Sequence, residues 1–179
     1  MIIVNNEEAL RVKCENVLPE EIGQLIEQLE RELKYSADVG RPGIGLAAPQ
    51  IGIAKNVAIV RSGKYKIDLV NCNISKAFDQ AIFDQEGCLS FPGRSERTNR
   101  FQEINIINNA VEPYSFIATG LLAVVCQHEL NHLDGILLSD VAIKQKIINS
   151  GNNNKKVQPN DKCPCLSQKK YKKCCGYGL

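Results

Sequence analysis

The sequence lacks the two features that would place it in a membrane or in a secretory pathway. None of its apolar runs approaches the roughly 20 residues that a membrane-spanning helix needs. Its first residues, Met1 to Glu8, contain no basic segment and too short an apolar stretch for a signal peptide. We therefore expect a cytoplasmic protein that does not associate with membranes.

The chain has little net charge, but its charges are unevenly distributed. The formal net charge of the 179 residues is +2. Residues 155–179, the basic tail, contain seven lysines and one aspartate, a formal charge of +6, so the preceding 154 residues carry −4. A mildly acidic body with a basic tail predicts that any polyanionic partner contacts the tail.

Cysteine, by contrast, is abundant. Four of the eight cysteines lie within residues 163–175. Without a secretion signal, this spacing indicates metal binding rather than a disulfide framework. The isolated Cys14, Cys72 and Cys126 are interpreted as packed, unreactive thiols.

Hydrophobic periodicity predicts two helices and several short strands. Pro19 and two following glutamates begin a helix with an apolar stripe at Ile22, Leu25, Ile26, Leu29 and Leu33. Residues 121–133 have the second helical pattern, and Gly135 suits its end. Four runs typical of strands suggest an antiparallel, meandering sheet: residues 56–61, 67–72, 104–108 and 114–119.

The strongest chemical signal is His128-Glu-Leu-Asn-His132, which contains both histidines of the chain. Two histidines four residues apart on a helix lie on one face, where both can bind one metal ion. Glu129 lies beside them and could contact a water molecule on that metal. The alternative is a pair of ordinary surface histidines, which would not require the glutamate.

The third protein ligand of such a site is not obvious from the pentapeptide. Because no glutamate follows Glu129 and no histidine follows His132, it could be Asp134, Asp140, a tail cysteine or an upstream residue. The segment Glu86-Gly-Cys-Leu-Ser90 is the upstream candidate, since Cys88 lies in a turn-like stretch there. Alone, Cys88 is more simply explained as a buried free thiol.

Three motifs belong together in this sequence: Gly43-Ile-Gly-Leu-Ala-Ala-Pro-Gln50, Glu86-Gly-Cys-Leu-Ser90 and Gln127-His-Glu-Leu-Asn-His-Leu-Asp-Gly135. They resemble the signature motifs of peptide deformylases, in the order and spacing of that family. The glycine-rich first motif is not a phosphate-binding loop, because no Gly-Lys-Ser/Thr follows it. The resemblance covers about residues 1 to 145 and implies an α+β fold, with antiparallel sheets packed around a central helix that carries the pentapeptide.

The resemblance also implies a metal site. Cys88, His128 and His132 would bind the metal, which in this family is usually Fe(II), with Zn, Ni or Co able to replace it. The pentapeptide departs from the family at Asn131, where an aspartate is common. If that aspartate pairs with an arginine such as Arg100, the neutral Asn131 would weaken the pair but leave the ligands unaltered.

Further roles follow from the same resemblance. Glu129 would be the general acid and base, Gln50 and the backbone N–H of Leu89 would stabilise the oxyanion, and Gly45 would contact the substrate backbone. The implied activity is metal-dependent hydrolysis of the N-formyl group from the N-terminal methionine of nascent polypeptides. A peptidase using the same helix, or a catalytically inactive deformylase fold that serves as a binding module, are the alternatives.

The C-terminal segment resembles a SEC-C zinc motif. Its four cysteines, Cys163, Cys165, Cys174 and Cys175, could form a closed tetrahedral zinc site, although Leu166-Ser-Gln168 replaces the usual Gly-Ser-Gly. A disordered, lysine-rich tail with idle cysteines is the alternative.

The expected organisation is a catalytic domain at residues 1–148, a linker at 149–160 and a zinc-binding motif, or zinc knuckle, at 161–179. The basic tail could bring the enzyme to the ribosome.

Overall fold

The computed structural model describes residues 1–143 and, beyond them, residues 158, 160, 170 and 173. The chain divides into two compact units, Met1–Lys144 and Gln145–Leu179. The expected linker at 149–160 and the zinc motif at 161–179 fall almost entirely outside the described residues. None of the helices in the described part is long and apolar enough to cross a membrane.

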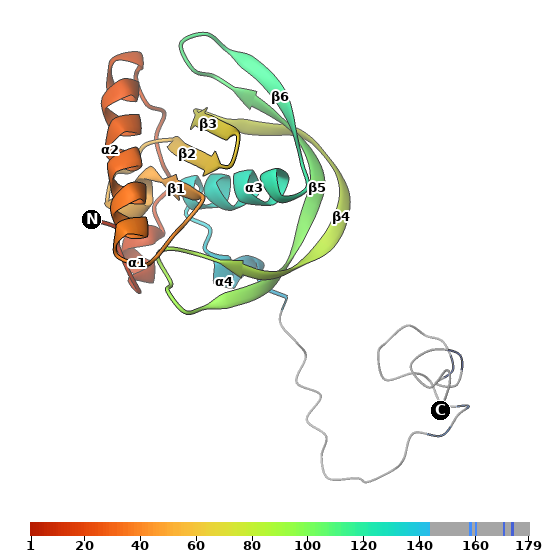
Figure 1. Ribbon diagram of the computed structural model, residues 1–179. Coiled ribbons are helices and arrows are strands. Elements are labelled where there is room, and N and C mark those ends of the chain that lie inside the picture. Colours follow the sequence, from red (N-terminus) through yellow and green to blue (C-terminus); the bar gives the residue numbers. More distant parts are fainter. Residues whose placement is uncertain (144–157, 159, 161–169, 171–172, 174–179) are drawn as a thin grey trace. The chain divides into compact units, whose positions relative to one another are not determined.

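The first unit is built from two antiparallel three-stranded sheets and a few helices (Figure 1). One sheet has the order β1-β2-β3 and the other the order β4-β5-β6. Their strands are β1 (Gly45–Ala47), β2 (Val57–Ser62), β3 (Tyr65–Val70), β4 (Asn73–Gly87), β5 (Ser95–Asn108) and β6 (Tyr114–Thr119). The helices are α1 (Glu7–Leu10), α2 (Pro19–Asp38), η1 (Ala48–Ile51, a 3-10 helix), α3 (Leu121–Leu133) and α4 (Leu138–Val141).

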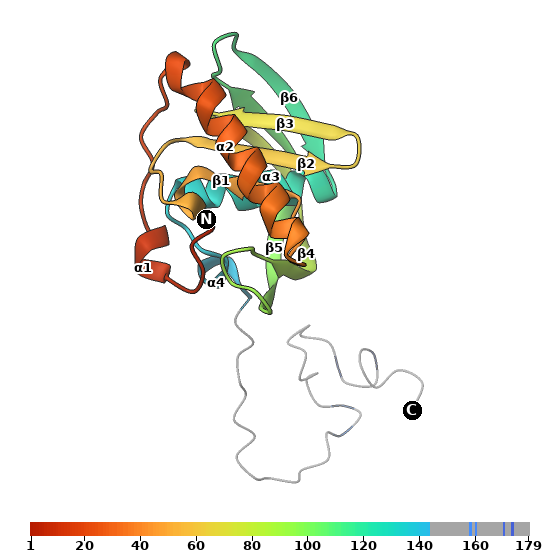
Figure 2. The same ribbon diagram turned by 60° about the vertical axis from the view of Figure 1, so that its left-hand side comes forward.

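Helix α2 covers the outer face of the β1-β2-β3 sheet (Figure 2). It begins at Pro19, and the Glu21 carboxylate accepts a hydrogen bond from the Leu18 N–H at 2.9 Å, which caps the first turn. Its stripe packs into one hydrophobic cluster with the sheet, and Leu29 is fully buried. The amphipathic pattern in the sequence therefore corresponds to a real packing face.

Strand β2 explains how two layers pack on one sheet. Val57 and Ile59 belong to the cluster under α2, whereas Ala58 and Val60 belong to the cluster around α3. Because side chains alternate along a strand, a sheet covered on both faces needs apolar residues at consecutive positions.

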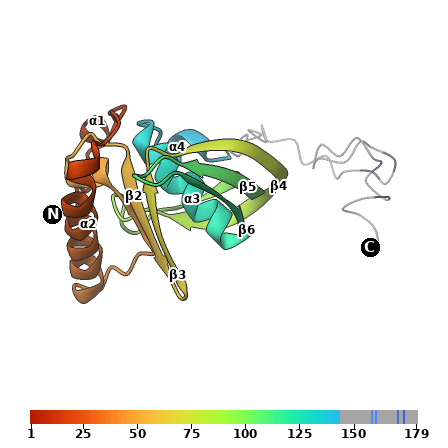
Figure 3. The same ribbon diagram turned by 90° about the horizontal axis from the view of Figure 1, so that it is seen from above.

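Helix α3 lies between the two sheets and contacts strands of both (Figures 1 and 3). Ten of its thirteen residues are buried, which is expected of a helix surrounded by protein on all sides. Its polar residues are thus enclosed in the core of the unit.

The long strand β4 brings the segment that contains Cys88 to α3. Two irregularities interrupt its pairing with β5, between Ile74 and Lys76 and between Phe83 and Glu86. The second one includes Gln85, whose φ of 62° lies in the left-handed region. Such bulges re-aim the following side chains, and here Glu86 is buried although its neighbours are exposed.

Candidate metal centre

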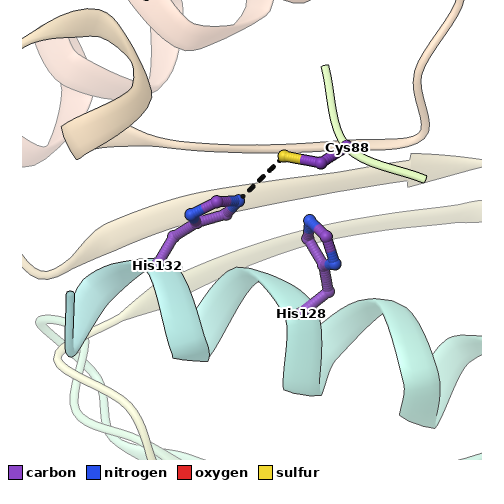
Figure 4. A group of neighbouring side chains, drawn as sticks. All are labelled: Cys88, His128 and His132. Atoms are coloured by element: carbon purple, nitrogen blue, oxygen red, sulfur yellow. Dashed lines mark hydrogen bonds between the residues drawn. The ribbon is translucent and has the colours of Figure 1, made fainter. Parts of the chain in front are cut away.

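Three side chains from two distant segments meet beside α3 (Figure 4). One ligand atom from each of Cys88, His128 and His132 lies within 4.8 Å of the others. The Cys88 sulfur is 3.3 Å from Nε2 of His132. This is the set that the sequence resemblance implies as metal ligands.

Local structure accounts for their positions. His128 and His132 are one helical turn apart on α3, so their rings project from the same face. Cys88 follows the end of β4, in a turn closed by a 3.0 Å hydrogen bond from the Phe91 N–H to the Cys88 carbonyl. All three residues are buried.

Glu86 holds His128 in one orientation. The ring Nδ1 of His128 lies 2.7 Å from the Glu86 carboxylate. That carboxylate also accepts hydrogen bonds from Thr98 at 2.6 Å and from two nitrogens of Arg100 at 2.6 and 2.9 Å. With the Nδ1 proton directed to Glu86, Nε2 of His128 is left with its lone pair for a ligand.

The Arg100 guanidinium also contacts Asn131, the residue at which the sequence differs from the aspartate common in the resembled family. Its third contact is a 2.6 Å hydrogen bond to the side-chain oxygen of Asn131. The expected pairing of Arg100 with position 131 is therefore present, but with a neutral acceptor. Among the described residues, Glu86 is the carboxylate that forms an ion pair with the buried Arg100.

The charged groups of this site shift one another's pKa in opposite directions. Burial lowers the pKa of His128, but the neighbouring Cys88 sulfur and Glu86 carboxylate more than offset this and raise it to about 10. Burial and the neighbouring His128 lower the pKa of His132 to about 3. Burial raises the pKa of Glu86, but hydrogen bonds from His128, Arg100 and Thr98 lower it to about 2. The site thus has an anionic carboxylate beside one sulfur and two imidazole nitrogens, a donor set that fits a transition-metal ion.

Glu129 adds a buried carboxylate to this group. Its Oε2 is buried and finds no hydrogen-bond partner in the described part of the chain. Burial raises the pKa of Glu129 to about 7. A buried oxygen without a partner is costly unless a bound species satisfies it, and Glu129 lines the pocket where one could bind.

Gly45, the expected substrate-contacting residue, lies directly against Glu129. A Cβ atom at position 45 would collide with Oε1 of Glu129. The absence of a side chain at this position of β1 therefore leaves room for the Glu129 carboxylate.

Gln50 and Leu89 contribute hydrogen-bond donors next to the cysteine. The Gln50 amide donates to the Cys88 sulfur at 3.6 Å and to the Ser90 hydroxyl at 3.1 Å, and its oxygen accepts from the Ala47 N–H at 2.9 Å. The backbone N–H of Leu89 finds no acceptor among residues 1–143. Two donors thus lie beside the three candidate ligands.

A pocket of about 470 Å³ opens onto this group. Its buried floor includes Gln50, Cys88, His128 and Glu129, and Val124 and Val125 of α3 make part of its wall apolar. A mostly apolar cavity with a few convergent polar groups is typical of a small-ligand or peptide side-chain site.

The other candidate ligands lie elsewhere. Asp134 caps the C-terminus of α3 and Asp140 pairs with Arg11 at 2.7 Å, and neither joins the histidines. The four tail cysteines lie outside the described residues. Burial raises the pKa of Cys72 and Cys126 to about 12, as expected of packed thiols.

Sequence reasoning gave no role to Glu86 or Thr98. Glu86 is the first residue of a quoted motif, and a carboxylate two residues before a candidate ligand was a usable signal. Thr98 carried no such signal in the sequence, because its contact with Glu86 depends on the pairing of β4 with β5.

Comparison with known proteins places this arrangement in a family. A profile described as polypeptide deformylase matches residues 1–147, and one described as SEC-C motif matches residues 160–176. A peptide deformylase of Heliobacterium modesticaldum is 43% identical over 121 residues, which are 66% of this chain and 76% of that protein. One from Natranaerobius thermophilus is 38% identical over 146 residues, 79% and 90% of the two chains.

Solved structures agree with the sequence relatives. The crystal structure of peptide deformylase from Thermotoga maritima has a TM-score of 0.72 at 28% identity and covers 80% of this chain and 97% of its own. A peptide deformylase from Synechococcus elongatus in complex with actinonin has a TM-score of 0.72 at 33% identity, with 81% and 79% covered. Since the polypeptide deformylase profile matches residues 1–147 and solved peptide deformylases share the fold, the chain belongs to the polypeptide deformylase family.

Proposed function

We propose that this enzyme removes the N-formyl group from the N-terminal methionine of nascent polypeptides and releases formate. The observation that carries the proposal is the convergence of Cys88, His128 and His132, of which Cys88 and His128 line a pocket that Glu129 also lines. These residue types in this arrangement suit hydrolysis assisted by a metal ion.

Cys88, His128 and His132 hold the metal in this proposal. When bound by these residues, a divalent ion would supply Lewis-acid chemistry, which would bring the pKa of a water molecule toward neutrality and polarise the formyl carbonyl. Fe(II) is the proposed ion and Zn, Ni or Co are its possible substitutes, because a mixed thiolate and imidazole set accepts all four. Glu86 fixes the His128 ring, and Arg100 and Thr98 fix Glu86.

The other site residues move the proton and stabilise the developing charge. Glu129 takes a proton from the attacking water and passes it to the leaving amine. The Gln50 amide and the Leu89 N–H donate hydrogen bonds to the carbonyl oxygen as it becomes negative. The backbone of Gly45 in β1 aligns the substrate chain.

The apolar part of the pocket receives the methionine side chain. Val124 and Val125 supply an apolar surface next to the candidate metal centre. Burial of an unbranched side chain there would orient the formyl carbon toward the metal.

The inactive binding module remains the alternative, and the site argues against it. A catalytically dead protein need not keep a buried carboxylate whose Oε2 has no partner within the described residues, as Glu129 has. Keeping such a group costs stability that only a function would justify.

For the rest of the chain we propose a linker at 149–160 and a zinc knuckle at 161–179 formed by the four tail cysteines. The SEC-C match over residues 160–176 supports it. One Zn²⁺ and four thiolates would offset the +6 charge of the basic tail by −2, which leaves a surface able to contact phosphates of the ribosome. A cytoplasmic location is part of the same proposal.

Formate release from formyl-Met-Ala-Ser tests the activity, with the metal content of the same preparation measured in parallel. Glu129→Gln is the matched control, which should retain the metal but lose about 10²- to 10⁴-fold in turnover. An enzyme that carries metal yet releases no formate would disprove the deformylase function. Full activity of Glu129→Gln would disprove the role of Glu129 instead.

A further inference from the structure

The mouth of the pocket differs in charge from its floor. The exposed lining residues are Pro42, Ile44, Gln85, Gly87, Pro92, Gly93, Arg94 and Leu121, and Arg41 is half-buried among them. Arg41 and Arg94 are the only charged side chains of this rim, and both are cationic. The acids that line the pocket, Glu86 and Glu129, are both buried.

Neither arginine is neutralised within the described part of the chain. No ion pair joins Arg41 or Arg94 to a carboxylate there, whereas five other acid–base pairs involve Arg11, Arg61 or Arg97. Arg94 also borders a small second cavity with Glu7 and Glu96, but neither is within ion-pair distance. Two unpaired guanidinium groups at one opening attract an anionic ligand.

Both arginines are held at the rim by short backbone contacts. The Arg41 N–H donates to the Ser36 carbonyl at 2.8 Å, and the Ser36 hydroxyl donates to the Arg41 carbonyl at 2.6 Å. The Arg94 N–H donates to the Phe91 carbonyl at 3.2 Å, and its guanidinium lies 5.8 Å from the Phe91 ring centroid. The backbone at each position is therefore anchored beside the opening, which both residues line.

We infer that Arg41 and Arg94 select, among formyl-methionyl peptides, those with an acidic side chain in the residues that follow the methionine. The inference rests on the proposed function, because a peptide whose methionine fills the pocket must leave it past this rim. A carboxylate meeting an arginine there forms the same contact in the ground state and in the transition state. The preference therefore lowers KM and leaves kcat unchanged.

The test uses formyl-Met-Ala-X-Ser amides with X as Asp, Asn or Lys, so that X carries the only variable charge. For the wild type, KM should rise in the order Asp, Asn, Lys, by about twofold to fivefold per step at low salt, the range typical of exposed ion pairs. The differences in KM among the three peptides should disappear as the ionic strength rises from about 0.01 M to about 1 M, because the Debye length falls from about 30 Å to about 3 Å.

Variants test whether the arginines of the rim, rather than charges elsewhere on the surface, set the peptide preference. Arg41→Gln/Arg94→Gln should give equal KM for the three peptides, Arg94→Lys should keep the order, and Arg94→Glu should favour Lys over Asn. Arg31→Gln removes the same charge from an exposed position of α2 outside the pocket and should keep the wild-type order.

Equal KM values in the wild type, or an unchanged order in the double variant, would overturn the inference. Turnover of the Asn peptide keeps the two proposals apart. Its absence contradicts the deformylase function itself, whereas turnover without charge preference contradicts only the role of the arginines.

Discussion

A Cβ atom at Gly45 would collide with Oε1 of Glu129 and lie 2.8 Å from its carboxyl carbon, so that the carboxylate in its present position leaves no room for a side chain at residue 45. The two residues come from β1 and α3, which the chain separates by more than 80 positions. Their contact sets where the proposed acid–base group can stand relative to the candidate ligands.

Gly45→Ala should therefore lower kcat strongly, by about 10²-fold or more, because a displacement of about 1 Å at a catalytic group costs that much. Metal content should stay close to that of the wild type, since the three atoms nearest the added Cβ all belong to Glu129 and none to a candidate ligand. Formate release and metal analysis measure the two effects. Gly23→Ala is the matched control, because nothing lies within 4 Å of its added Cβ. Similar activities of the two variants would contradict the steric argument.

Cys88→Ser should lower both the metal content of residues 1–143 and the activity, because a hydroxyl is a poor ligand for the soft ions that a thiolate binds. Cys126→Ser changes the same atom in the core without a candidate ligand role. It should leave the metal content intact even if it lowers stability. Metal analysis of a preparation truncated at Asn152, which lacks the tail cysteines, makes the comparison direct. Retention of the full metal content in Cys88→Ser would mean that the third ligand lies elsewhere.

Glu86→Gln should destabilise the protein by about 3–5 kcal/mol, because it removes the carboxylate that forms an ion pair with the buried Arg100. It should also weaken metal binding by about 10- to 100-fold, since His128 loses its Nδ1 acceptor. Urea unfolding and metal titration provide the two values. Glu103→Gln on β5 should fall within about 0.5 kcal/mol of the wild type, as a half-exposed position away from the site does. A stable Glu86→Gln variant would show that Asn131 and water suffice for Arg100.

Truncation at Asn152 should remove zinc but leave formyl-peptide turnover in solution unchanged. It should also abolish ribosome co-sedimentation at low salt, because it removes the basic tail that is proposed to contact phosphates. For the full chain, the slope of log K against log salt should be about −0.7 to −0.9 for each phosphate neutralised. The full chain at high salt is the internal control. An unaltered zinc content after truncation would rule out the knuckle, and equal sedimentation of both forms would rule out the ribosome contact.

The sequence predicted those elements whose pattern is local. The stripe from Ile22 to Leu33 lies within α2, residues 121–133 coincide with α3, and residues 114–119 coincide with β6. In each case the periodicity reflects one apolar face against a continuous layer.

Strand β4 was not predicted, and β5 was recognised only from residue 104 onward. β4 is an edge strand with mostly exposed side chains, and its two irregularities interrupt the alternation of apolar and polar residues. Its pairing partners, from Ile107 to Ser95, are set by tertiary structure and leave no local signal.

For the site, motif resemblance selected Cys88, His128 and His132, and the structure brings them together. Spacing alone could not have done so, because the cysteine and the histidines meet only through the curvature of β4 around α3. The hydrogen bonds that join Arg100 to Glu86 and Glu86 to His128 could not be predicted from the sequence for the same reason.

The enclosure of α3 between two sheets predicts that this helix and strand β4 open at different rates. Amide protons of a helix buried on all sides exchange mainly through global unfolding, whereas those of an exposed edge strand exchange through local fraying. We therefore expect the amide protons of His128 and His132 to exchange among the slowest of the described residues, and those of the exposed part of β4 before Glu86 among the fastest. Because Glu86 is hydrogen-bonded to Arg100 and His128, the end of the strand that leads to Cys88 should exchange with the helix rather than with the rest of β4.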